Sequence, residues 1–328
     1  MALGQVGVDT VKDSLNYVLA PSSSVMRNRI INGQMQISQR GTSGTSGSGV
    51  PTTTATYPSV DRWFAYGTGA TVTVAQVSGA TNTKNLIQLT GAASVTGAGI
   101  GQRIEAVNCY DMAGQTVTLS ANIANSLLTT VTWTAYYASS SDVWTSSTQI
   151  ATGSWTVSST IANYSAQIAI PSAATTGIQI IFSVGAQTSG TFQIGNAQLE
   201  VGLNATGFEY RQYGTELALC QRYFQSYGGQ SANDMVTMGG TSSTSSAVAI
   251  VQLPVSMRTN PSVGYTAVSA LFVDDNSSGG ASTAITTGAY GLTSAYLSIT
   301  TGATLVAQRP ARIYINGSSA RLTWSAEL

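Results

Sequence analysis

The sequence contains no histidine among its 328 residues. That absence excludes Ser-His-Asp and Cys-His nucleophilic schemes, imidazole metal ligands, and the side chain most often used as a general base near neutral pH. Cysteine is also scarce, and neither Cys109 nor Cys220 has a basic partner nearby in the sequence that could activate a thiolate. We therefore expect no enzymatic activity, no cofactor and no metal. The spacing of the two cysteines does not require a disulfide, so we expect buried free thiols and leave their pairing open.

Charge is the second shortage. Only 8% of the residues are charged, against ~25% in an ordinary soluble domain, and Lys12 and Lys84 are the only lysines. Thirteen basic and thirteen acidic side chains form no basic patch along the chain, which argues against a nucleic-acid partner. There is no apolar run of the ~18 residues that a membrane span needs, and no signal-peptide pattern, so we expect neither membrane insertion nor secretion.

Ser, Thr and Gly occupy the surface positions that charged residues usually hold, while a hydrophobic share of 43% argues against disorder. A neutral surface of this kind suits close packing between copies, which favours a homo-oligomer. The alternative is a β-protein whose polar, uncharged surface has no such role.

Residues 28–212 contain about nine segments with alternating or β-branched residues, separated by Gly, Ser, Asn and Pro clusters. No helical period separates them, so the pattern predicts a jelly-roll β-sandwich rather than βαβ units. Residues 228–328 have a similar rhythm and predict a smaller C-terminal β-sandwich. Within it, Asn316-Gly317 is a strong signal for a hairpin.

Two helices are expected outside these β-rich regions. Thr215 can cap a bridging helix within 213–227, in which Leu217, Cys220 and Phe224 would form a buried stripe. Residues 1–27 predict a short helix, capped near Asp9 and running to about residue 20. Three turns are too short to be stable alone, so this segment would dock on a partner or on its own domain.

Several segments carry a family resemblance. They are NRIINGQMQISQRGTS (28–43), VDRWFAY (60–66), GQRIE (101–105), AGQTVTLSANI (113–123), and GNAQLEVG, FEYRQYG and ELALCQRYFQ within 190–225. In this order they resemble the signature of tailed-bacteriophage virion proteins, mostly tail-fibre and adsorption proteins. PVSMRTNPSV (254–263) and the final SAEL are similar to later parts of the same pattern.

The resemblance implies a virion structural protein, most of all a short tail fibre or adsorption component. It would form a homo-oligomer, expected to be a trimer, and residues 1–27 would attach it to other virion proteins. A capsid decoration protein that stabilises the head is the alternative, and a glycan-cleaving tailspike enzyme is less favoured. Such modules serve different roles on the particle, so the resemblance implies the fold more directly than the role.

Host surface polysaccharide is the remaining candidate partner, because sugar sites use exposed aromatic rings framed by polar side chains. The stretch WTAYYASSSDVW gathers the candidate glycan contacts Trp133, Tyr136, Tyr137, Asp142 and Trp144 around one hairpin. The alternative interpretation is that the tryptophans are core rings of the sandwich.

The carboxylates that could act as a catalytic pair also have structural explanations. Glu209 and Arg211 are spaced to form a salt bridge, and Asp274-Asp275-Asn276 has the composition of a turn. The other acidic candidates are Glu105, Asp111, Asp142 and Glu200.

Overall fold

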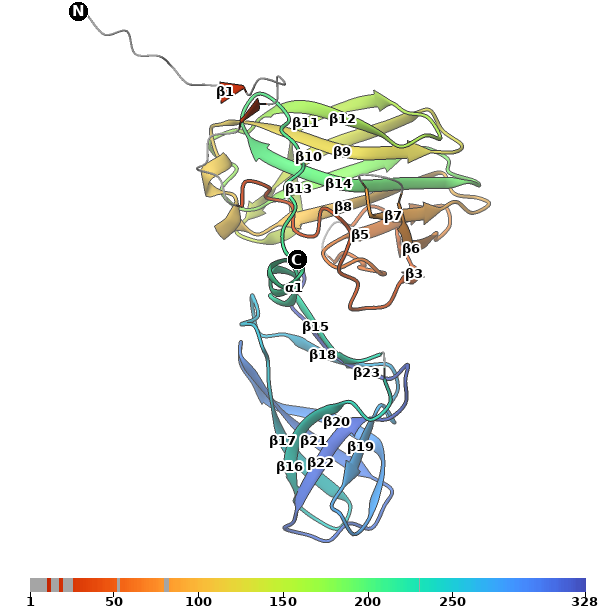
Figure 1. The fold of residues 1–328 in the computed structure, drawn as a ribbon, viewed down its shortest axis with the longest axis vertical. Coiled ribbons are helices and arrows are strands. Elements are labelled where there is room, and N and C mark those ends of the chain that lie inside the picture. Colours follow the sequence, from red (N-terminus) through yellow and green to blue (C-terminus); the bar gives the residue numbers. More distant parts are fainter. Residues whose placement is uncertain (1–10, 13–17, 20–25, 52–53, 80–82, 230) are drawn as a thin grey trace, which may run out of the picture. The chain divides into compact units, whose positions relative to one another are not determined.

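The computed structural model describes residues 11–12, 18–19, 26–51, 54–79, 83–229 and 231–328, and only the backbone of 11–12, 18–19 and 288–290. This part of the chain is mainly β, as expected, and contains one α-helix. It forms two compact units (Figure 1). The jelly-roll unit comprises residues 1–35, 46–56 and 64–211, and the barrel unit comprises 36–45, 57–63 and 212–328. The division therefore differs from the predicted domains, because two segments of the N-terminal half belong to the barrel unit.

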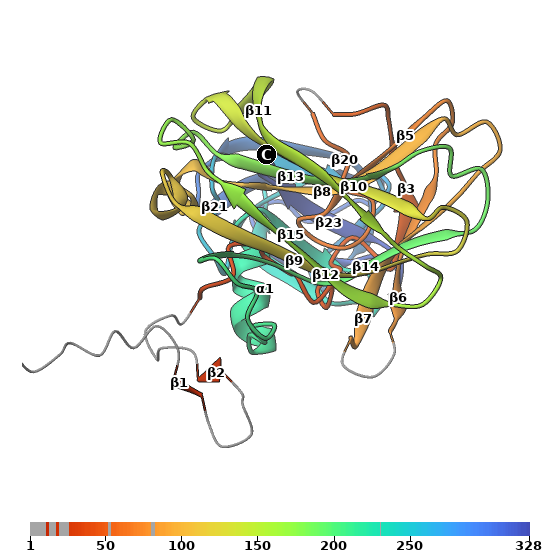
Figure 2. The same ribbon diagram turned by 90° about the horizontal axis from the view of Figure 1, so that it is seen from above.

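The jelly-roll unit is built from two layers, in which the strand pairs are antiparallel except for the parallel pair of β4 with β5 (Figure 2). Sheet I has the strand order β11 (Val143–Thr156), β10 (Thr130–Ser140), β13 (Ile178–Val184), β8 (Gly97–Ile104), β5 (Phe64–Thr68), β4 (Gly47–Ser48). Sheet II contains, in order, β12 (Ala162–Ala169), β9 (Thr116–Asn125), β14 (Thr191–Val201), β7 (Asn85–Thr90), β6 (Thr73–Ser78). The expectation of a jelly-roll β-sandwich in this region is confirmed.

Alternation along β9 shows why these segments become strands. Val117, Leu119 and Ile123 are fully buried, while the residues between them point to the opposite face of sheet II. The strand therefore presents one apolar face to the core and one polar face, of which Asn122 is part. Two 3-10 turns, Ala106–Asn108 and Tyr110–Met112, connect β8 to β9.

The barrel unit contains a closed barrel rather than the expected open sandwich. Its strand order is β16 (Met235–Thr241), β17 (Ser246–Gln252), β21 (Ser294–Thr301), β20 (Gly279–Tyr290), β19 (Leu271–Asp274), β22 (Pro310–Ile315). A separate sheet has the order β15 (Phe224–Gly228), β23 (Arg321–Ser325), β18 (Ser262–Tyr265). The barrel interior is filled by small and branched aliphatic side chains, and closure leaves its six strands without an open edge.

The bridging helix is shorter than predicted. Helix α1 runs from Tyr213 to Gln221, and Gln212 rather than Thr215 is its N-cap residue. Cys220 is fully buried and Leu217 is half-buried, as a packed stripe requires. Phe224 is buried too, but it pairs with Ser325 as the first residue of β15, so strand pairing overrides the helical period there.

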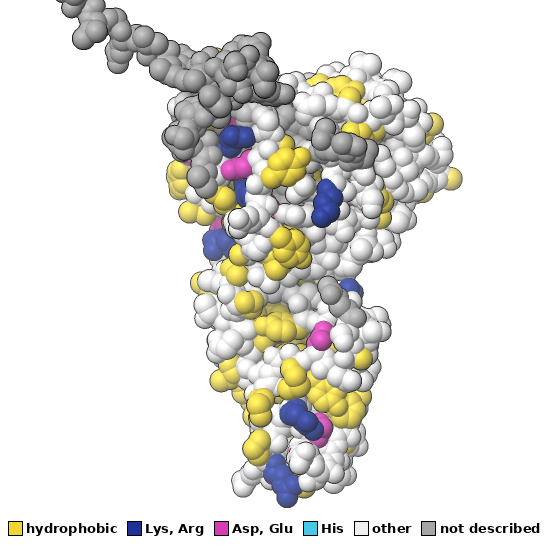
Figure 3. Space-filling view, in the orientation of Figure 1, with side chains coloured by type: hydrophobic (Ala, Val, Ile, Leu, Met, Phe, Trp, Pro, Cys, Tyr) yellow, Lys and Arg dark blue, Asp and Glu magenta, His cyan; other side chains and the backbone are white. Residues whose placement is uncertain are grey.

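The predicted N-terminal helix falls mostly outside the described residues. Where the backbone is described, Val11–Lys12 (β1) and Val18–Leu19 (β2) form a short antiparallel pair instead. Each of these two-residue strands begins with a valine, whose branched β-carbon favours an extended backbone. No helix in the described part of the chain is long and apolar enough to cross a membrane. The surface in Figure 3 carries few charged side chains, as the composition predicts.

A buried charge cluster joins distant segments of the barrel unit. Arg40 Nη2 donates to Glu327 Oε1 at 2.8 Å, Arg40 Nη1 donates to Asp61 Oδ1 at 3.1 Å, and Arg62 Nη1 donates to Glu327 Oε2. The Cζ atom of Arg62 also lies 3.6 Å from the ring centroid of Tyr223. The motifs QRG, DRW, RYF and SAEL thus meet at one place.

Candidate functional site

The hairpin predicted to contact glycans does not present its tryptophan rings. Trp133 is 7% exposed and lies 6.3 Å from Trp155, which itself stacks on Tyr164 of the opposite sheet at 5.8 Å. Trp144 is 4% exposed and lies 5.0 Å from the Arg103 guanidinium. Both predicted contact tryptophans are therefore core rings, because each finds partners inside the sandwich.

The other residues of that hairpin are divided between faces. Tyr136 and Tyr137 are half-buried and, as consecutive strand residues, point to opposite sides of sheet I. Asp142 holds a turn with φ of 58°, and its Oδ1 accepts a hydrogen bond from Ala106 N at 2.8 Å. The structure therefore does not gather the five predicted contacts into one site.

A polar pocket instead lies on the outer face of sheet II. It has a volume of about 300 Å³ and is formed by β9, β12, β14 and the loop that follows β14. Its walls are three asparagines, two hydroxyl side chains, one glycine and two aromatic rings: Asn122, Asn163, Asn196, Ser120, Thr206, Gly207, Phe208, Tyr210.

Two strand asparagines orient each other across the floor. Asn122 and Asn163 are directly opposite in the β9–β12 pairing. Asn163 Nδ2 donates to Asn122 Oδ1 at 3.0 Å, and Asn122 Nδ2 donates to Thr83 Oγ1 at 2.6 Å. An amide group has two N–H donors and a carbonyl acceptor, so this chain of bonds fixes both side chains and uses part of their capacity.

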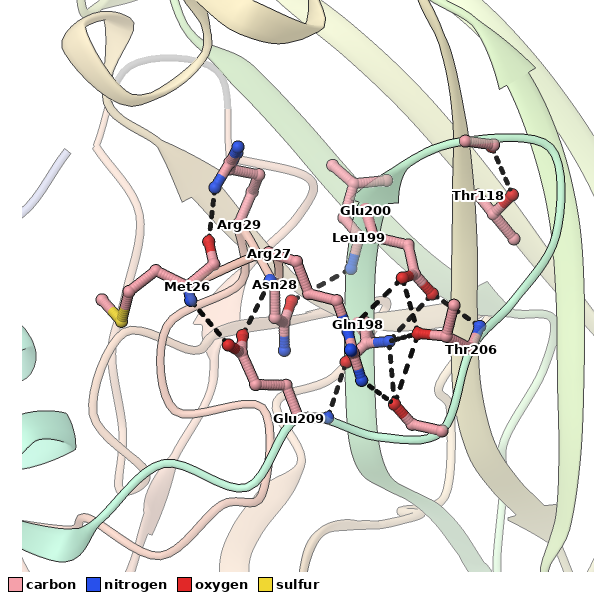
Figure 4. Close-up of polar contacts among 12 residues, drawn as sticks. Met26, Arg27, Asn28, Arg29, Thr118, Gln198, Leu199, Glu200, Thr206 and Glu209 are labelled. Atoms are coloured by element: carbon pink, nitrogen blue, oxygen red, sulfur yellow. Dashed lines mark hydrogen bonds and ion pairs between the residues drawn. The ribbon is translucent and has the colours of Figure 1, made fainter. Parts of the chain in front are cut away.

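The aromatic wall is held on the sheet by two buried side chains of β14 (Figure 4). Gln198 Oε1 accepts from Glu209 N at 2.8 Å, and Glu200 Oε1 accepts from Thr206 N at 2.8 Å. Thr206 Oγ1 also donates to Glu200 Oε2 at 2.7 Å. The loop is thereby fixed at both ends of the segment 206–209, which places Phe208 beside the strand asparagines.

Residues 26–30 also hold this loop, through the side chain of Glu209 (Figure 4). Glu209 accepts hydrogen bonds from Met26 N at 2.7 Å and from Asn28 N at 2.9 Å. Arg211 donates to the carbonyl oxygens of Asn28 and Ile30, and its Nη2 lies 3.4 Å from Glu209 Oε2, so the predicted salt bridge is confirmed.

A bulge in β14 positions the third asparagine. The β14–β9 register shifts between Gly195 and Gln198, and Asn196 has a φ of 46°. Asn28 Nδ2 donates to Ala197 O at 3.0 Å, which satisfies a carbonyl of the bulge. Gly33 is required opposite it, since a Cβ there would lie 2.1 Å from Ala197 O. Residues 28–33 thus hold the bulge at 195–198 in place.

The two rings form an edge-to-face pair. Their centroids are 5.0 Å apart with an interplanar angle of 81°, and Tyr210 is 58% exposed. Since Glu209 and Arg211 alternate with Phe208 and Tyr210, an extended backbone turns the charged pair inward to the 26–30 segment and the rings to the pocket. This alternation is visible in the sequence and was the signal that could have located the aromatic wall. The pairing of Asn122 with Asn163 leaves no such signal in the sequence.

The pocket has no ionisable acid or base among its lining residues. Amide and hydroxyl groups can exchange paired hydrogen bonds with neighbouring hydroxyls of a ligand, while an aromatic ring contacts an apolar face. This set of groups suits a neutral polyhydroxylated molecule of small size.

The remaining candidates from the sequence have structural roles in the described part of the chain. Cys109 and Cys220 are buried free thiols, and burial raises the pKa of the Cys109 thiol to about 11. Asp111 pairs with Arg29, and Asp274 Oδ1 accepts from Asn276 N at 2.7 Å, as in the expected turn. No group of three or more Cys, Asp or Glu side chains in the described residues is placed to hold a metal ion.

Comparison with known proteins returned solved structures only. No family model and no curated protein matches the chain. A structure described as "CBM4 structure and function" is 15% identical, with a TM-score of 0.36, over 52% of this chain and 98% of its own. A putative sugar binding protein from Bacteroides thetaiotaomicron is 13% identical, with a TM-score of 0.39, over 54% of this chain and 100% of its own. The enzymatically active domain of tailspike protein 4 from bacteriophage CBA120 is 16% identical, with a TM-score of 0.34, over 54% of this chain and 22% of its own.

Proposed function

We propose that the jelly-roll unit binds a neutral oligosaccharide in the pocket on sheet II, and that the protein is a bacteriophage virion component of the tail-fibre or adsorption type. The observation that carries the first part is the combination of oriented amides with an exposed aromatic wall in one pocket. The second part is supported by the segments that resemble tailed-phage virion proteins, whose residues build the two networks described above.

The physical fit to a sugar comes from geometry as much as from composition. Asn122 and Asn163 are held before any ligand arrives, so binding does not have to order them. The wall at 206–210 is fixed to Gln198 and Glu200 in the same way. One shallow sugar site binds weakly, so a homotrimer would raise the avidity for a polysaccharide on the host surface without new contacts.

Binding rather than cleavage is the proposed activity. With no histidine in the chain, cleavage would depend on a pair of carboxylates. Glu200 and Glu209, the acids nearest the pocket in sequence, accept backbone hydrogen bonds that hold the loop. A capsid decoration protein is the second candidate, and the low surface charge favours it because a neutral surface can pack closely between neighbouring capsid subunits (Figure 3).

The binding proposal is tested by glycan-array screening followed by titration of the best neutral oligosaccharide. We expect Asn163→Ala and Tyr210→Ala to weaken binding about tenfold each, which corresponds to about 1.4 kcal/mol. Tyr213→Ala is the matched control, because Tyr213 is 60% exposed and lies outside the pocket. Unchanged affinity in both pocket variants, or no neutral glycan bound at all, would reject the proposed site.

The location on the particle needs a separate experiment. Immunogold labelling of intact particles should mark the tail, and labelling of the head shell would support the decoration alternative instead. Deleting residues 1–25, which keeps the contact of Met26 with Glu209, should leave a folded protein that no longer enters particles, since residues 1–27 are proposed as the attachment. Continued incorporation of the truncated protein would remove that assignment.

A further inference from the structure

A second pocket lies on the outer wall of the barrel, where β19, the start of β20 and β22 adjoin. Its volume is about 420 Å³, and it belongs wholly to the barrel unit. Its lining includes Phe272, Asp274, Ser277, Gly279, Arg312 and Tyr314.

The floor of this pocket is an aromatic pair. Phe272 and Tyr314 are direct cross-strand partners, and their rings stack at 5.1 Å with an interplanar angle of 18°. Leu271 and Ile313 are fully buried in the barrel core, so the alternate residues Phe272 and Tyr314 lie on the outside. Both rings are only half-buried there, which leaves them available to a ligand.

A glycine allows the Phe272 ring to lie against the sheet. Gly279 pairs with Asp274, and a Cβ at Gly279 would lie 2.7 Å from the Phe272 ring. Any larger residue would push the ring away from this position. The platform is therefore built by the strand pairing together with the missing side chain.

Charged side chains lie around the aromatic pair of Phe272 and Tyr314. Arg312 Nη2 lies 2.5 Å from Asp274 Oδ2, and the Arg312 side chain is 51% exposed. Arg309 Nη1 donates to Ser277 Oγ at the rim. Arg312 is thus an exposed cation of the pocket lining, and Asp274 is its ion-pair partner.

The neighbouring Asp275 is a second carboxylate here, and it interacts electrostatically with the Arg309 guanidinium, so these two charges offset each other. Asp275 is buried, its Oδ1 accepts from Ser277 N at 2.9 Å and Ser278 N at 2.7 Å, and its Oδ2 accepts from Val306 N at 2.6 Å. These bonds shape the turn that carries Ser277. The preference for an anion therefore rests on the exposed Arg312, because a guanidinium has enough N–H donors to hold Asp274 and a second carboxylate together.

We propose that this pocket is a second saccharide site, selective for a sugar residue that carries a carboxylate. The pyranose ring would lie on Phe272 and Tyr314, and the carboxylate would pair with Arg312. This site is separate from the pocket on sheet II and has the opposite preference, since that pocket is lined only by neutral groups. The protein would then recognise neutral and acidic sugars through different units.

The test uses two oligosaccharides that are identical except that one contains glucuronic acid where the other contains glucose. Each is titrated into the full-length protein. We expect the acidic member to bind more tightly, to lose affinity as salt rises, and to bind at least tenfold more weakly to Arg312→Gln. Gly279→Val should weaken binding similarly by displacing the Phe272 ring. Thermal unfolding of each variant shows whether the barrel remains folded.

Two controls separate this proposal from the one for sheet II. Arg29→Gln removes another ion-paired, partly exposed arginine and should not change binding of the acidic sugar. Asn163→Ala should weaken the neutral sugar alone. Equal affinity of folded Arg312→Gln and wild type for the acidic sugar, equal binding of both sugars, or no binding of the acidic one would overturn the inference. Loss of the Asn163 effect alone would overturn only the site on sheet II.

Discussion

The jelly-roll unit and the barrel unit both tie together segments that are far apart in sequence, but they do so with different chemistry. In the jelly-roll unit the ties are amides and carboxylates that bind backbone groups, as Asn28 and Gln198 do. In the barrel unit the ties are ions that bind one another, as Arg62 and Glu327 do. This chain therefore places much of its scarce charge inside the fold rather than on its surface. The buried charged residues in the described part are Asp61, Arg62, Arg103, Glu105, Glu200, Glu216 and Asp275.

Breaking the buried charge cluster should have the largest effect. Arg62→Ala leaves Glu327 inside the barrel unit still paired with Arg40, and it removes the cation over Tyr223. Removing one member of a buried ion pair costs about 3–5 kcal/mol, so we expect about 4 kcal/mol here. Hydrogen exchange should report the loss in β15, β18 and β23 rather than in β9 and β14.

A double-mutant cycle with Glu327→Ala checks the cause. If the pair itself is responsible, the double variant should be less destabilised than the sum of the two single variants. A cost below about 1 kcal/mol for Arg62→Ala would place the cluster among weak surface pairs and remove the contrast between the units.

Removing a neutral tie of the jelly-roll unit should have the next largest effect. Asn28→Ala deletes the donor to Ala197 O and the Oδ1 acceptor for Leu199 N and Ile30 N. Each buried backbone group left without a partner costs about 1–3 kcal/mol, and we expect about 3 kcal/mol in all. The exchange rates should rise in β14, and the exposed Asn204→Ala is the control. Equal exchange in both variants would show that the bulge does not depend on this side chain.

The stability of the barrel unit should depend on pH in the acid range because of Asp275. The hydrogen bonds from Val306 N, Ser277 N and Ser278 N hold the pKa of this carboxyl below its ordinary value of 3.8. The folded state therefore binds the proton less readily than the unfolded chain does. The stabilisation is complete above pH ~4 and is lost as the pH falls through the unfolded and then the folded pKa. We expect the melting temperature of the barrel unit to fall below about pH 4, and Asp275→Asn to flatten that dependence. An unchanged pH profile in the variant would assign the acid sensitivity to another group.

Local patterns in the sequence were enough to predict most strands and the jelly-roll unit. The alternation at Val117, Leu119 and Ile123 determines which face of β9 is buried, and it needs no distant information. The Glu209–Arg211 pair was predictable for the same reason, since it depends on neighbours in the chain. The pairing of Cys109 with Cys220 was left open, because it depends on residues far apart in sequence; the structure shows two buried free thiols.

Long-range pairing limited the remaining predictions. Asn316-Gly317 does lie at a turn, but β22 pairs with β16 and β19 whereas β23 pairs with β15 and β18, so the predicted hairpin is wrong. The pocket on sheet II depends on the pairing of Asn122 with Asn163, which lie 41 positions apart. The tryptophans drew attention to the wrong hairpin because large rings stabilise a core as well as they bind a sugar.

The smallest expected effect concerns an exposed ion pair. It tests whether an ion pair of this chain contributes to stability because it is buried or because charged residues are few. Arg29 and Asp111 form an ion pair in the jelly-roll unit with side chains 26% and 51% exposed. Water screens such a pair, so Asp111→Asn should change the free energy of unfolding by less than about 1 kcal/mol, and less still at high salt. Chemical denaturation at low and high salt measures both. A loss as large as that of Arg62→Ala would mean that any charge in so neutral a chain is structurally important wherever it lies. A small loss would attribute the strength of the barrel cluster to its exclusion from water, which the exposed pair of Arg29 with Asp111 lacks.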